Sequence, residues 1–138
     1  MMKTFLILFV CLAAFCAKGQ TLVLGQDTLQ LHADHFVDGH DTTTHSLASS
    51  FVVYGNQKIS WAQKDGGYVL DYPVQSVTGT WADLATDGSM DFAVKFNTKS
   101  GTFHIEKSQG VLTVSMQFPE NGKNTMPYTF YIDTYAKQ

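Results

Sequence analysis

The chain has 138 residues and a formal net charge of −3, and all nine of its basic residues are lysines. Without arginine it has no planar side chain for bidentate contacts with phosphate or guanine, and no basic stripe takes that place. This composition argues against a nucleic-acid partner, and the length allows for one domain.

The first segment, Met1–Gly19, has the features of a secretory signal peptide. Lys3 precedes an apolar run, Thr4–Ala17, which is too short to span a bilayer comfortably. We expect cleavage after Gly19, which would leave residues 20–138 as a single secreted or periplasmic domain. We also expect that the protein is not an integral membrane protein, because the remaining chain is short for eight membrane-spanning strands with loops.

Removal of this segment would also remove both cysteines, Cys11 and Cys16. The mature domain would then be free of disulfides and held by its core alone, which is feasible at about 120 residues. Catalysis by a thiol is excluded for such a chain. Seven lysines would face twelve acidic residues, so the net charge would become −5.

The segments that follow the signal are short and strand-like. Two strands are expected over Thr21–Leu24 and Thr28–Ala33, and then a polar, turn-rich interval, His35–Ser50, shows no alternation. Alternation returns in Phe51–Tyr54 and Lys58–Gln63. The pattern therefore predicts strands on both sides of a long loop.

Further strands are expected over Tyr68–Tyr72 and Val74–Trp81. Pro73 separates them, and because proline has no backbone donor we expect the first strand to end there or to run along an edge. Gly79 lies inside the second strand and could mark a bulge where the sheet bends.

The clearest pattern is a period-two alternation through three consecutive segments between Gly88 and Phe118. Because successive side chains of a strand point to opposite faces, each segment has one apolar face and one polar face that is exposed to solvent. Asn97–Gly101 and Ser108–Gly110 connect the segments, and their glycines can take the positive φ of a tight hairpin. The inward residues would be Met90, Phe92, Val94, Phe96, Phe103, Ile105, Leu112, Val114, Met116 and Phe118.

A closing strand, Tyr128–Ile132, completes eight or nine strands with little helix. Short connections favour pairing between sequential strands, so residues 20–138 are predicted to form a single all-β antiparallel meander. Two architectures stay open, a small up-and-down barrel and a two-sheet sandwich.

The succession of hairpins, with Gly79-Thr80-Trp81 and later Gly101-Thr102-Phe103, resembles small secreted lipocalin-like domains. The resemblance covers the general layout from about Val74 onward and transfers no specific site residue. It implies an eight-stranded barrel that encloses an apolar ligand.

Aromatic residues on the inferred inner face are the candidate ligand-binding residues. In a barrel they would line a pocket for a small apolar molecule, whereas in a sandwich they would be core. The alternative is a protein or glycan recognition module of the cell envelope, with a packed core and outer tyrosines such as Tyr54, Tyr131 and Tyr135. The candidates are Trp61, Tyr68, Trp81, Phe92, Phe103 and Tyr128.

Histidines are concentrated between the second predicted strand and the interval that follows it. Imidazole and carboxylate groups are ligands for zinc, copper or nickel, and Asp34, Asp38 and Asp41 lie among them. The same residue types are also ordinary at a solvated strand end and could respond to pH near 6. The candidate metal ligands are His32, His35, His40 and His45.

No catalytic constellation is evident in the sequence. There is no Gly-x-Ser-x-Gly elbow for a serine nucleophile, and the two glutamates, Glu106 and Glu120, fall on a wet strand face and in a loop. We therefore expect a non-enzymatic binding protein, with no cofactor predicted.

Overall fold

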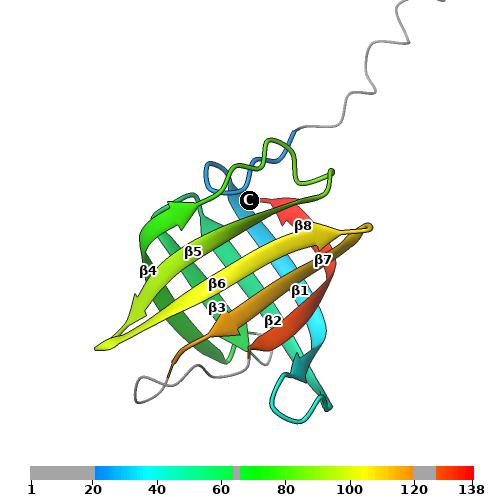
Figure 1. Ribbon diagram of the computed structural model, residues 1–138, viewed down its shortest axis with the longest axis vertical. Helices are drawn as coiled ribbons and strands as arrows, with labels where there is room; N and C mark the ends of the chain where they lie inside the picture. Colours follow the sequence, from blue (N-terminus) through cyan, green and yellow to red (C-terminus); the bar gives the residue numbers. More distant parts are fainter. Residues whose placement is uncertain (1–20, 64–65, 120–126) are drawn as a thin grey trace, which may run out of the picture.

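The computed structural model describes residues 21–63, 66–119 and 127–138, which form eight antiparallel strands. Each strand pairs with the next along the chain, and β1 pairs with β8, so the sheet closes into a barrel (Figure 1). The predicted all-β meander is confirmed, and of the two architectures it is the barrel. The strands are β1 (Thr28–Asp38), β2 (Thr44–Tyr54), β3 (Lys58–Gln63), β4 (Tyr68–Thr78), β5 (Gly88–Phe96), β6 (Lys99–Ser108), β7 (Val111–Gln117) and β8 (Tyr128–Lys137).

This layout is consistent with that of lipocalin-like domains. The predicted signal segment, Met1–Gly19, lies outside the described residues, so its cleavage and the secretion of the domain stay predictions. Within the described ranges, no helix is long and apolar enough to cross a membrane.

The alternation between Gly88 and Phe118 places one side of each strand in a common interior. Met90, Phe92 and Val94 of β5 are buried, and the same holds for alternate residues of β6 and β7. Burial of these apolar side chains is the main driving force for closing the barrel. The fully buried large side chains include Phe51, Phe92, Phe103, Phe130, Leu29, Leu31, Ile59 and Ile105.

One end of the barrel is covered by the N-terminal segment, residues 21–27, and by the β4–β5 connection, residues 79–87. In Figure 1 both lie over the end at which the chain terminates, and we call this the plugged end. The amide of Leu84 donates to the carbonyl oxygen of Leu22 at 2.8 Å, which ties the two segments together. Leu24 and Leu84 are buried there.

Asp27 anchors the plugged end to the wall of the barrel. Its carboxylate accepts a hydrogen bond from the amide of Val23 at 2.8 Å and lies 3.5 Å from the ammonium of Lys137. The Val23 hydrogen bond holds the pKa of Asp27 below its ordinary value. The charged form of Asp27 therefore stabilises this end above the ordinary carboxyl pKa, and that stabilisation is lost as the pH falls through the lowered value.

Two predictions about the first third of the chain are wrong. Thr21–Leu24 is not a strand but leads into a turn, and His35–Ser50 contains the end of β1 and the start of β2. A bulge between Ala33 and His35 breaks the alternation, and Thr44–Ser46 are exposed. Because this part of the hairpin has little apolar surface to bury, its sequence does not show the alternation of a half-buried strand.

Pro73 does not end its strand. It pairs with Lys58, the first residue of β3, and from Val74 onward β4 pairs with β5. The amide of Val74 donates to the carbonyl oxygen of Gln57 at 2.9 Å. Pro73 thus lies where the pairing of β4 with β3 ends and its pairing with β5 begins. A residue without a backbone donor is tolerated at this position.

The turns use glycine differently from the prediction. β4 ends at Thr78, and Gly79, with φ +102°, turns the chain away from the barrel wall before Trp81. Gly110 has the expected positive φ of 79°, but Gly101 lies within β6, and Asn97, with φ 55°, forms the β5–β6 turn instead. Asparagine tolerates this left-handed region better than most residues.

Candidate functional site

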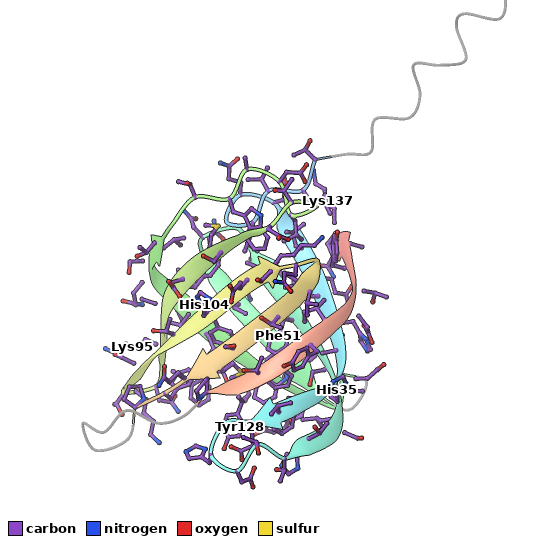
Figure 2. The ribbon with its side chains drawn as sticks, turned by 45° about the vertical axis from the view of Figure 1, so that its right-hand side comes forward. His35, Phe51, Lys95, His104, Tyr128 and Lys137 are labelled. Carbon is purple, nitrogen blue, oxygen red and sulfur yellow. The ribbon has the colours of Figure 1, made fainter. Side chains whose placement is uncertain are left out.

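A series of aromatic rings runs through the centre of the barrel, and Phe51 is its middle member. The centroid of the Phe51 ring lies 4.9 Å from that of Phe130, 5.9 Å from that of Trp61 and 6.2 Å from that of Phe103. The Phe130 and Phe103 contacts are edge-to-face, a favourable geometry for ring pairs. In Figure 2 Phe51 lies between the two ends of the barrel marked by Lys137 and Tyr128, and it has no exposed surface.

Tyr72 continues the series on the other side of Phe103. Its ring centroid lies 5.0 Å from that of Phe103, 5.1 Å from that of Phe96 and 5.6 Å from that of Phe118. Only 4% of Tyr72 is exposed. Burial, with a smaller contribution from Tyr68, raises the pKa of Tyr72 to about 12.

This shift predicts an alkaline loss of stability that Tyr72→Phe should reduce. Above the ordinary tyrosine pKa of 10.0 the unfolded chain releases the proton, whereas the folded state keeps it until about pH 12. The free energy of unfolding of the wild type should therefore fall by up to about 2 kcal/mol more than that of the variant over this range. Urea titrations at about pH 8 and pH 11.5 measure the difference, and parallel losses in the two proteins would contradict the prediction.

At the end of the barrel away from the plug, the rings are only partly buried. Phe36 lies 5.1 Å from Phe130, 5.1 Å from the ring of His45 and 5.6 Å from Tyr128, between ring centroids. Tyr128 is 41% exposed, and in Figure 2 it lies at the end opposite Lys137. We call this the aromatic end, and its residues are Phe36, Tyr68, Phe96, Phe118 and Tyr128.

The centre of the barrel is filled by its own side chains. Phe51 and Phe103 have no exposed surface, and Phe130 is 1% exposed. A cavity of about 330 Å³ formed by described residues lies instead at the plugged end, where Leu24, Trp81 and other residues line it. Because the described rings of Phe51, Phe103 and Phe130 leave almost no accessible surface, a ligand that reached them would have to displace side chains.

Four of the six candidate ligand-binding residues belong to the ring series or pair with one of its members. Trp61 and Phe103 both contact Phe51, and Tyr128 joins the series through Phe36. Phe92 is fully buried and pairs with Phe103 across β5 and β6. The alternation in the sequence thus identified four residues that lie close to one another in the structure.

The other two candidates lie elsewhere. Tyr68 begins β4 and is 57% exposed, so it contributes to the aromatic end and not to the centre. Trp81 is buried at the plugged end, where its indole nitrogen donates to the carbonyl oxygen of Thr86 at 3.0 Å. Its position follows from the turn at Gly79, which takes the chain out of the strand.

Six members of the ring series were not among the sequence candidates for ligand binding: Phe36, Phe51, Tyr72, Phe96, Phe118 and Phe130. Phe51 alternates with its neighbours, so the inward pattern of Phe51 and Val53 could have identified it. Phe36 could not be found this way, because the bulge in β1 brings Ala33 and Phe36, three residues apart, to the same interior.

The four candidate metal-binding histidines have four different partners. Nδ1 of His32 lies 2.8 Å from a carboxylate oxygen of Asp133, and His35 stacks on Tyr131 with ring centroids 5.5 Å apart. The other two lie near the β1–β2 turn: Nδ1 of His40 is 2.9 Å from Asp38, and Nε2 of His45 is 2.8 Å from the hydroxyl of Thr43.

Two groups with one histidine and two carboxylates each could hold a metal ion by proximity. In each group the ligand atoms lie within 4.8 Å of one another, and the groups are His32, Asp34 and Asp133, and Asp38, Asp41 and His45. All of these side chains are at least partly exposed. Their contacts are those of ordinary solvated ion pairs and turns, so the proximity alone assigns no metal.

The fifth histidine, His104, lies in a polar row across the outer face. Its Nδ1 is 2.6 Å from Asp91, and its Nε2 is 3.4 Å from Glu106. Ser115 pairs with His104 in register, so the residue types of a hydrolase triad stand side by side. The hydroxyl of Ser115, however, lies 3.1 Å from that of Thr129, and the second imidazole nitrogen faces Glu106.

No protein-family model matches the chain, and a comparison with curated proteins finds no significant match. A functional assignment therefore depends on the geometry of the barrel.

Proposed function

We propose that this protein is a non-enzymatic binding protein that holds a small apolar ligand against the rings of its aromatic end. The observation that carries the proposal is the asymmetry of the barrel. One end is plugged by residues 21–27 and 79–87, whereas at the other a continuous ring series reaches from buried Phe51 to partly exposed Phe36 and exposed Tyr128.

The size of the barrel and the exposed surface of its rings both favour the aromatic end as the binding site. The interior of an eight-stranded barrel is just wide enough to be filled by side chains or to hold one small ligand. Aromatic surface that stays in contact with water is a source of binding free energy, about 25 cal/mol for each Å² that a ligand covers. The ligand would therefore bind where the rings are partly exposed and could move aside, with Phe51 and Phe103 as its floor.

Substitutions of two tyrosines of β8 should differ in their effect on the affinity for an apolar ligand. N-phenyl-1-naphthylamine, a neutral apolar fluorescent probe, should bind the wild type saturably. Tyr128→Ser should weaken this binding about tenfold, because it removes about 1.4 kcal/mol or more of apolar contact. Tyr131→Ser, the matched control on the outer face, should leave it unchanged. Absence of saturable binding, or equal effects of the two variants, would contradict the proposal.

A second candidate is recognition of a protein or glycan by the outer surface. It is favoured by the filled centre and by the exposed stack of His35 on Tyr131, with ring centroids 5.5 Å apart. An aromatic ring exposed on a sheet can stack on a sugar or anchor a protein partner. Native mass spectrometry of the protein from its own host separates the candidates. A retained small molecule supports the first, and a macromolecular partner that Tyr131→Ser releases supports the second.

A further inference from the structure

The indole nitrogen of Trp61 has no hydrogen-bond partner, although the atom itself is buried. Within the described parts of the chain it is the one buried side-chain polar atom in this condition. The other tryptophan forms a direct contrast, because Nε1 of Trp81 donates to the carbonyl oxygen of Thr86 at 3.0 Å. A buried indole N–H usually finds a partner, and one that does not lowers the stability of the folded state.

The surroundings of Trp61 explain why the nitrogen is unpaired. Its ring lies parallel to that of Phe51, at 13° and 5.9 Å, and edge-to-face with that of Phe130, at 72° and 5.3 Å. Its cross-strand neighbours are Phe51 on β2 and Leu70 on β4, which are hydrocarbon as well. The side chains of these three neighbours supply apolar contact but no lone pair, and a contact of the N–H with a ring face is only a weak substitute.

We infer that the ligand of the proposed site carries a neutral acceptor oxygen, and that the indole N–H of Trp61 donates to it. This inference rests on the proposed function and narrows its ligand class to apolar carbonyl compounds such as ketones, aldehydes or esters. A carboxylate is disfavoured because a charge is costly to bury among hydrocarbon side chains. A plain hydrocarbon would leave the N–H unpaired.

Access to the nitrogen requires a side chain to move, because neighbouring atoms cover it. Phe36 is only partly buried and Tyr128 is 41% exposed, and both belong to the ring series that leads to Phe130 and Trp61. Displacing these rings costs less than displacing fully buried Phe51. The acceptor would therefore enter from the aromatic end.

The first test needs no ligand and compares the two tryptophans. A benzothienylalanine introduced at one position at a time replaces the indole N–H by sulfur and keeps the shape of the ring. At position 61 the melting temperature should stay unchanged or rise. At position 81, where the hydrogen bond to Thr86 is lost, it should fall by about 3–6 °C. An equal fall at position 61 would show that the N–H already has a partner and would overturn the inference.

The second test uses two probes of the same shape, 2-acetylnaphthalene and 2-isopropenylnaphthalene, which differ by a carbonyl oxygen against a methylene group. The preference of the wild type for the ketone, expressed as the ratio of the two dissociation constants, should fall about tenfold when position 61 carries benzothienylalanine. An unchanged ratio overturns the inference but leaves the proposed function intact. If neither probe binds the wild type, the proposed function fails and the inference fails with it.

Discussion

Replacing Phe51 with alanine is expected to lower the free energy of unfolding by about 3–5 kcal/mol. Phe51 has no exposed surface, and its ring contacts those of Trp61, Phe103 and Phe130. The substitution removes the apolar contact and leaves a cavity that four different strands would have to close. Urea denaturation followed by circular dichroism measures the loss, which should appear in the midpoint and not in the slope.

Tyr131→Ala is the matched control, because Tyr131 is also aromatic and on a strand but is 38% exposed on the outer face. It should cost less than about 1 kcal/mol. The cavity in the Phe51→Ala variant should also bind benzene, which would raise the melting temperature of that variant and not that of the wild type. If both substitutions cost the same, the rings do not form the common core that the binding proposal requires.

The strands between Gly88 and Phe118 were predictable because one physical constraint acts on all of them. Each has one face in the barrel and one in water, so burial imposes a period of two that the sequence shows directly. The hairpin turn at Gly110 was predictable for a different reason, which is local: its φ of 79° favours glycine. Closure into a barrel was one of two open alternatives, because alternation constrains faces and not the partner of the last strand.

The hairpin formed by the end of β1 and the start of β2 was not predictable from alternation. Ala33 and Phe36 both face the interior although an odd number of positions separates them, because of the bulge at Asp34. Beyond the bulge the strands carry histidine, threonine and serine on exposed faces, which is also the composition of a loop. In this part of the hairpin, β1 and β2 are held together by hydrogen bonds between their backbones. Such hydrogen bonds do not require any particular pattern of side chains.

The candidate site was predictable as a region but not in its polar detail. Alternation correctly placed Trp61 and Phe103 in the interior, since inward position is a property of one strand. Whether an indole N–H finds an acceptor depends on at least three strands at once, and no local pattern distinguishes Trp61 from Trp81 in this respect. The position of Trp81 in the plug depended on a single backbone angle, that of Gly79.

Gly88→Ala is expected to destabilise the plugged end, although it adds only one methyl group. A Cβ at position 88 would lie 2.5 Å from Cδ1 and 2.6 Å from Nε1 of Trp81, closer than such atoms can approach. The ring has little room to yield, because it is 5% exposed and its Nε1 is bonded to the carbonyl oxygen of Thr86. We expect a loss of about 3 kcal/mol in the free energy of unfolding, at the upper end of ordinary overpacking.

Gly110, which has open space around the position of a Cβ, provides the control for this substitution. A Cβ at Gly110 would meet nothing within 4 Å, so Gly110→Ala should cost only the strain of its φ of +79°, about 1 kcal/mol. In a Trp81→Leu background, where the indole is absent, Gly88→Ala should cost clearly less than in the wild type, which a double-mutant cycle measures. If Gly88→Ala is no more costly than Gly110→Ala, Trp81 is not held in the plug. The asymmetry between the two ends of the barrel, on which the binding proposal depends, would then be lost.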